Sequence, residues 1–176
     1  MTAPLRALAP LLAQSRRVAI LAVGSRLNGD DYAGMAAGEL LKPMENGQSL
    51  LIAQGSNAPE NCTGQIRAFR PDAVLVLDAA HMEKSPGEYA LLRPEEITGA
   101  TFSTHMLPLP VTLNYLEAAC GCRTAYIGIQ PRTVEQGIGM CAQVEAGVRQ
   151  LAAELAELLR PAAGTAEEDA AAEGQE

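Results

Sequence analysis

The chain has 176 residues, of which 48 % are hydrophobic but only 3 % aromatic, and it contains no tryptophan. This length supports one domain with an aliphatic core, which favours helices packed on a parallel sheet over an aromatic-rich β-sandwich. The formal charge of −8 comes mainly from an acidic segment at 161–176, and without a basic stripe or an apolar run of ~20 residues we expect neither nucleic-acid binding nor a membrane span.

The apolar periodicity predicts helices alternating with strands. In chain order we expect a helix at 3–14, a strand at 17–23, a helix at 33–41, a strand at 49–53, a helix at 58–68, a strand at 73–78, an edge strand at 88–92, at most a helical turn at 94–97, a helix at 111–119, a strand at 124–129 and a long helix at 140–159. This alternation predicts an α/β fold, a three-layer sandwich with a mainly parallel twisted sheet between helices.

The predicted domain covers residues 1–160. Residues 161–176 are expected to be a disordered acidic tail because they cannot bury enough apolar surface to fold. An arginine pair precedes the strand at 17–23, but the apolar run that follows is too short for an export signal. We therefore expect a cytoplasmic protein. Its cysteines form no CxxC pair, and we expect free, buried thiols at Cys62, Cys120, Cys122 and Cys141.

Asp31, Asp78 and His105 occupy comparable places in this predicted fold. Asp31 follows the strand at 17–23, Asp78 ends the strand at 73–78, and His105 lies in a loop before the next predicted helix. Open α/β sheets bind ligands outside the carboxyl ends of their strands, so these three side chains are expected to converge there. Two carboxylates and one imidazole suit a divalent cation with at least one position left open.

Some of these residues also have plainer explanations. Asp30 and Asp31 stand where helix starts favour aspartate, and a lone histidine is more often an ordinary polar group than a ligand. Asp78 is harder to explain in this way, because a carboxylate that closes an apolar strand must be solvated or paired. His81 lies close behind Asp78 and competes with His105 for the place of the third ligand.

A nucleotide site is a weaker alternative. The segment Gly24-Ser-Arg-Leu-Asn-Gly29 lacks the middle glycine of GxGxxG, and the two aspartates after it disfavour a pyrophosphate. The chain also offers no GxSxG motif and no convincing cysteine–histidine pair for a serine or cysteine hydrolase.

Six strings in order resemble the maturation endopeptidases of nickel–iron hydrogenases, especially the hydrogenase 3 type. The strings are Gly24-Ser-Arg-Leu-Asn-Gly-Asp-Asp31-Tyr-Ala-Gly34, Asn57-Ala-Pro-Glu-Asn61, Leu77-Asp78-Ala79, Pro86-Gly-Glu88, Ser103-Thr-His105-Met-Leu-Pro-Leu109 and Gly128-Ile-Gln-Pro131. The resemblance extends from about residue 17 to 160. It implies an α/β fold and an enzyme that removes a C-terminal extension from the hydrogenase large-subunit precursor after nickel insertion.

The resemblance also implies that Asp31, Asp78 and His105 are the metal-binding and catalytic residues, and it selects His105 over His81. The nickel would be supplied by the precursor, the expected protein partner. The sequence leaves open whether the ion reports completed loading, polarises the scissile carbonyl or activates water. Asp30 is expected to orient Asp31 or the helix start.

Three positions depart from the family pattern. Ser25 replaces a usual asparagine, Gln54-Gly55 replaces a frequent Asp-Gly, and Tyr32 replaces a frequent small residue, which points to a reshaped cleft mouth. Gln54 motivates an alternative, in which the protein is a non-proteolytic nickel-sensing or precursor-holding maturation factor.

Overall fold

The computed structural model describes residues 2–93, 95–96 and 108–160. His105 and the predicted tail at 161–176 lie outside the described residues, as do both ends of the predicted helical turn at 94–97. The division into a domain at 1–160 and a tail therefore stays a prediction.

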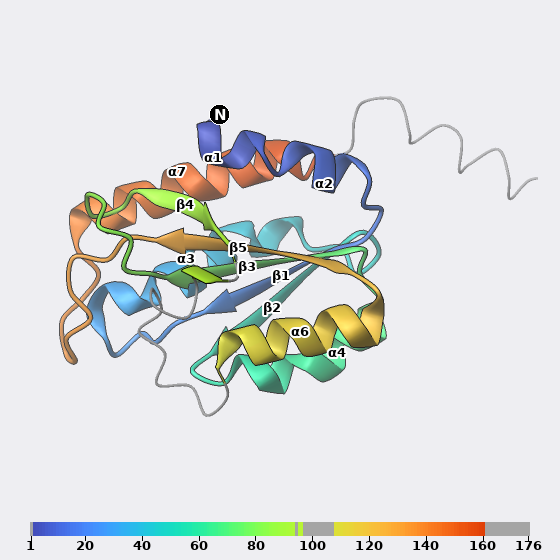
Figure 1. Ribbon diagram of the computed structural model, residues 1–176. Helices are drawn as coiled ribbons and strands as arrows, with labels where there is room; N and C mark the ends of the chain where they lie inside the picture. Colours follow the sequence, from blue (N-terminus) through green and yellow to red (C-terminus); the bar gives the residue numbers. More distant parts are fainter. Residues whose placement is uncertain (1, 94, 97–107, 161–176) are drawn as a thin grey trace, which may run out of the picture.

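Five strands form one sheet in the order β2-β1-β3-β5-β4 (Figure 1). They are β1 (Val18–Val23), β2 (Leu50–Ser56), β3 (Ala73–Ala79), β4 (Tyr89–Leu92) and β5 (Arg123–Ile129). The pairings β1·β2, β1·β3 and β3·β5 are parallel, whereas β4 runs antiparallel to β5 at one edge. The predicted mainly parallel sheet and its edge strand are confirmed.

Helices cover both faces of the sheet. The α-helices are α1 (Ala3–Arg6), α2 (Ala9–Ala13), α3 (Ala33–Leu41), α4 (Thr63–Phe69), α6 (Leu109–Cys120) and α7 (Ala142–Leu158), and the 3-10 helices are η1 (Gly29–Tyr32), η2 (Lys42–Met44) and η3 (Pro59–Cys62). Figure 1 shows α1, α2 and α7 above the sheet and α4 and α6 below it. No helix among the described residues is long and apolar enough to cross a membrane.

Alternate residues of the central strands supply two separate cores. Ile20, Leu75 and Ile127 pack with α1, α2, α3 and α7. Leu21 and Val76 belong to the opposite core, with α4 and α6. Because successive side chains in a strand point to opposite faces, both faces of these strands must be apolar. This explains the nearly continuous apolar runs in the sequence and the three-layer architecture.

Three predicted elements differ from the observed ones. The helix predicted at 58–68 is the 3-10 helix η3 followed by the short helix α4. The predicted helix at 3–14 is two short helices, because Pro10 has no N–H to donate to the preceding turn. The strand predicted at 49–53 continues to Ser56, because the pairing with β1 extends through Gln54 and, after a bulge, to Ser56. Here strand pairing outweighs the weak strand propensity of the polar residues.

The four cysteines are free thiols, as expected. Cys62 and Cys122 are buried, but Cys120 and Cys141 are only partly buried, which corrects the expectation of four buried thiols. Cys120 ends α6 and Cys141 precedes α7, so both lie at helix ends rather than in a packed strand.

The order of the strands places a topological switch point between β1 and β3. The chain leaves β1 through α3 to reach β2 on one side, and then crosses back to β3 on the other side of β1. Helix α3 therefore begins at the carboxyl ends of β1 and β3, where open α/β sheets form their ligand-binding crevice. A side chain at Gly34 would lie 2.2 Å from the carbonyl oxygen of Leu77 and 2.5 Å from that of Val23. Because Gly34 has no side chain, the first turn of α3 packs directly against the ends of both strands.

We expect the Gly34→Ala variant to lose about 1–3 kcal/mol of unfolding free energy, because a methyl group would push α3 away from the two carbonyl groups. The control is Gly64→Ala in α4, where an added Cβ meets nothing within 4 Å. That change should be neutral or stabilising by up to ~1 kcal/mol, since alanine favours helices. Urea denaturation measures both variants, and equal stabilities would contradict the proposed close packing.

Candidate functional site

Asp31 lies in η1, between the end of β1 and the start of α3. Its carboxylate accepts a hydrogen bond from the backbone N–H of Ser25 at 2.8 Å. Gly24 makes this turn possible, because it has a φ of +124° and an added Cβ there would lie 1.9 Å from the carbonyl oxygen of Asp31. Asp31 is partly exposed.

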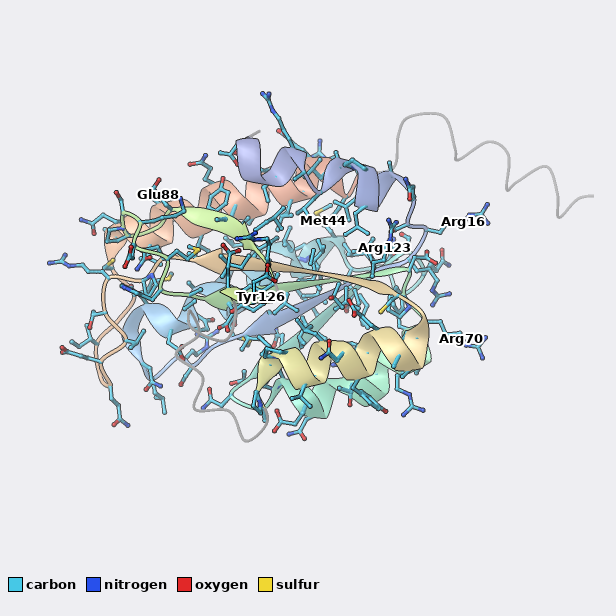
Figure 2. All side chains as sticks on the ribbon, in the orientation of Figure 1. Arg16, Met44, Arg70, Glu88, Arg123 and Tyr126 are labelled. Carbon is cyan, nitrogen blue, oxygen red and sulfur yellow. The ribbon has the colours of Figure 1, made fainter. Side chains whose placement is uncertain are left out.

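Asp78 is a buried carboxylate near the end of β3, only 3 % exposed. It accepts a hydrogen bond from the hydroxyl group of Tyr126 on β5 at 2.7 Å (Figure 2 labels Tyr126). Asp78 pairs with Gly128 and Tyr126 pairs with Val76, so the two side chains lie on the same face two positions apart. This is the face that α4 and α6 cover.

The carboxylates of Asp31 and Asp78 lie close enough to repel each other. The pKa of Asp78 is raised to about 7, mainly by burial and also by the negative charge of Asp31, while the hydrogen bond from Tyr126 and one from the backbone of Ala79 oppose the shift. The pKa of Tyr126 is raised well above its ordinary value by burial and by Asp78. A cation placed between the two carboxylates would remove this repulsion and hold Asp78 in its charged form.

The structure thus brings two of the three predicted site residues together, and His105 lies outside the described residues. Within the described part of the chain, no group of three or more His, Cys, Asp or Glu residues has the arrangement of a metal site. His81 follows β3 and is exposed, and its Nδ1 lies 3.4 Å from Nε2 of Gln130. The three-residue ligand set and the choice of His105 over His81 remain predictions.

Asp30 anchors the turn that carries Asp31 to a distant loop. Its side chain is fully buried, and its carboxylate accepts hydrogen bonds from the backbone N–H groups of Arg132, Thr133 and Cys141 at 2.8, 3.1 and 2.7 Å. Its own N–H donates to the carbonyl oxygen of Thr133. Asp30 therefore fixes the 132–141 loop to the turn that carries Asp31, rather than capping the start of α3.

A second buried polar residue holds the loop that follows β3. The side-chain oxygen of Gln130 accepts hydrogen bonds from the N–H groups of Met82 and Lys84 at 2.7 and 3.2 Å. Between this loop and the 132–141 loop lies a cavity of about 430 Å³, lined by His81, Pro86, Gln130, Pro131, Arg132, Thr133 and Val134. Neither Asp31 nor Asp78 is among its lining residues.

Tyr32 is not among the residues that line this cavity, and its expected effect on the cleft mouth stays a prediction. It packs against the core formed with α3 and α7, and the guanidinium of Arg26 lies 4.5 Å from its ring centre. Ser25 keeps the turn in place through its backbone N–H to Asp31, and its hydroxyl accepts a weak hydrogen bond from Leu27 at 3.3 Å.

Sequence reasoning missed Tyr126 as the partner of Asp78, although a signal was present. Tyr126 is the only residue with a polar tip in the apolar run Ala125–Ile129, and parallel pairing of that run with 73–78 brings it near Asp78. The role of Asp30 had no such signal, because its partners are backbone groups more than 100 positions away.

Comparison with known proteins identifies the family. A sequence profile of the hydrogenase maturation protease family HycI matches residues 35–158. The chain belongs to this family. The matched range includes Asp78 and His105 and begins just after the turn that carries Asp31. The hydrogenase 3 maturation protease of Escherichia coli K12 is 34 % identical over 116 residues, which cover 65 % of this chain and 73 % of that protein.

Solved structures of hydrogenase maturation proteases share this fold. The crystal structure of HycI from Thermococcus kodakarensis, a NiFe hydrogenase maturation protease, superposes with a TM-score of 0.80 and 30 % identity over 88 % of this chain and 99 % of that one. The solution structure of the endopeptidase HycI from Escherichia coli gives a TM-score of 0.70 and 30 % identity over 79 % and 88 % of the two chains. The α/β fold and the protease role predicted from the sequence are confirmed.

We expect the Asp30→Ala variant of this maturation protease to lose about 3 kcal/mol of unfolding free energy, because three backbone N–H groups lose a charged acceptor. The control is Asp72→Ala. Asp72 is exposed and also accepts two backbone N–H groups, those of Arg16 and Arg17. Water can replace it, so its loss should cost only about 1 kcal/mol. Equal losses in urea denaturation would contradict the role assigned to Asp30.

The stability of the protein should depend on pH through Asp78. Its pKa is raised to about 7 in the folded state, so between roughly pH 4 and 7 the folded chain keeps a proton that the unfolded chain has lost. Stability therefore falls as the pH rises through this window.

Asp78→Asn removes this titration and keeps an acceptor for Tyr126. At pH 8 the variant should be more stable than the wild type by on the order of 2 kcal/mol, and the two should converge below about pH 4. Urea denaturation across this pH range measures the difference. A difference that does not change with pH would show that the Asp78 carboxyl group is not held protonated.

Proposed function

We propose that the protein removes the C-terminal extension of a nickel–iron hydrogenase large-subunit precursor after nickel insertion. The observation that carries the proposal is the pair of carboxylates, Asp31 and Asp78, at the switch point between β1 and β3 in a member of the maturation protease family. Nickel belongs to the precursor, and in this proposal it is recognised as part of the substrate.

The chemistry of the two carboxylates fits a divalent transition metal. Asp78 is buried with one side-chain donor, Tyr126, and faces a second negative charge, so its ionised form lacks a compensating cation. Carboxylate oxygen and imidazole nitrogen are both ligands for such metals, and nickel favours the nitrogen. A nickel ion bound there would supply positive charge and Lewis acidity, and its presence would mark a precursor that has completed metal insertion.

His105 is proposed as the third ligand. It stands four residues before Leu109, which begins α6 and is buried in the core on the face where Asp78 meets Tyr126.

Asp31, Asp78 and His105 would contact the metal, whereas the other residues would position them. Tyr126 orients the carboxylate of Asp78 through its hydroxyl group. The Ser25 N–H holds the carboxylate of Asp31. Asp30 connects this turn to the 132–141 loop, so both parts of the sheet edge keep a fixed relative position.

The cleavage reaction tests the proposal directly. Purified nickel-loaded precursor incubated with the protein should lose mass at its C-terminus, as measured by intact mass spectrometry, while precursor without nickel should stay uncut. If the protein binds the precursor and leaves its mass unchanged, the protein is a precursor-holding factor instead. Gln54, which is exposed near the end of β2, is the position that motivates this second outcome.

We expect Asp31→Asn, Asp78→Asn and His105→Ala each to slow cleavage by at least about tenfold, the loss that even outer-shell changes cause at metal sites. Circular dichroism should show that each variant folds. The contrast is His81→Ala, which should slow cleavage less than His105→Ala does. If His81→Ala is impaired and His105→Ala is not, the third ligand is His81.

A further inference from the structure

The cavity lies between the loop that follows β3 and the 132–141 loop. It is at the same edge of the sheet as the carboxylates of Asp31 and Asp78. His81 follows the end of β3, and Gln130 follows the end of β5 directly. Both loops are held by buried polar side chains, Gln130 on one side and Asp30 on the other. The cavity therefore has fixed walls, and its volume of about 430 Å³ is large enough for several side chains of a peptide.

Arg132 gives the cavity a positive charge. Its backbone N–H is held by Asp30, its side chain is exposed, and no carboxylate among the described residues forms an ion pair with it. Glu135 on the same loop also makes no ion pair with it. Arg132 also borders a second hollow of about 470 Å³, which Thr133, Glu135, Ile138, Gly139 and Cys141 line with it. A planar guanidinium so placed suits a carboxylate ligand, which it can bind through two parallel hydrogen bonds.

The rim beside Arg132 is apolar. Leu27 is 65 % exposed and Ile138 is 45 % exposed. The N–H of Gly137 donates to the carbonyl oxygen of Leu27 at 2.8 Å, so the two apolar side chains stand on loops that lie side by side. Exposed apolar side chains next to an uncompensated cation are a combination found where proteins bind peptides.

We propose that this cavity receives the C-terminal extension of the precursor and that Arg132 binds a carboxylate of that segment. The inference rests on the proposed function, because it assigns the place where the leaving part of the substrate is held. The carboxylate is either the chain terminus of the extension or an acidic side chain within it. Arg132 is then a specificity-determining residue that acts on substrate binding, apart from the carboxylates that meet the metal.

The test compares Arg132→Gln with Arg16→Gln. Arg16 is also exposed, and Figure 2 shows it at the opposite end of the sheet from Glu88, which pairs with Gln130 at the cavity edge. Affinity for the nickel-loaded precursor is measured by titration, and cleavage by steady-state kinetics. Arg132→Gln should weaken binding and raise KM about tenfold or more, with kcat nearly unchanged. Arg16→Gln should match the wild type in every measurement.

Added salt and charge-reversed variants distinguish an ion pair between Arg132 and the substrate from a structural role of Arg132. Added salt should raise KM for the wild type more than for Arg132→Gln, because only the wild type has the ion pair to screen. Synthetic extension peptides with a free terminus, with an amidated terminus, or with acidic side chains replaced by amides compete for the site and identify which carboxylate is bound. Arg132→Glu should regain affinity when the corresponding acidic residue of the extension is replaced by lysine.

The outcomes separate the two proposals. If the wild type cleaves the precursor and Arg132→Gln behaves like Arg16→Gln, the cavity does not bind the extension and the proposed function stands. If the wild type does not cleave but its binding of the precursor depends on Arg132, the extension site stands and the proposed proteolysis fails. If neither cleavage nor Arg132-dependent binding is found, both proposals are wrong.

Discussion

The arrangement of the candidate site depends on the contact between the first turn of α3 and the ends of β1 and β3. At Gly34 the carbonyl oxygens of Val23 and Leu77 leave no room for a side chain. The turn before α3 is fixed in the same way, because the backbone of Asp31 lies directly against Gly24. The two glycines allow the close backbone approaches of the turn between β1 and α3. This turn places the Asp31 carboxylate near Asp78.

Burial then sets the chemistry of this edge. Asp78 lies in a strand whose other side chains are apolar, and Tyr126 alone among the described side chains donates a hydrogen bond to it. Another buried acid, Asp30, accepts hydrogen bonds from three backbone N–H groups. Asp30 has a structural role, whereas the buried carboxyl group of Asp78, with a raised pKa and a second carboxylate nearby, suits a cation supplied from outside.

The sequence predicts the fold well because the strands are buried on both faces and appear as continuous apolar runs. Helix α3 and strand β4 lie within a residue of their predicted positions. Polar side chains that bind distant backbone are harder to predict, and Asp30 is the clear case. Its partners lie on a loop with no regular periodicity, so neither pattern nor spacing connects them. The sequence did not single out Arg132 either, because the role proposed for it depends on the cavity that it lines.

The hydrogen bonds that Asp30 accepts also determine which part of the 132–141 loop can vary in sequence. They hold the 132–141 loop at its two ends, through Arg132 and Thr133 on one side and Cys141 on the other. The intervening tip is mostly exposed, and a side chain added at Gly139 would meet nothing within 4 Å. Mutation can therefore change the length and composition of the tip without disturbing the carboxylate pair. The surface beside the carboxylate pair can therefore vary while the residues that carry the chemistry stay in place.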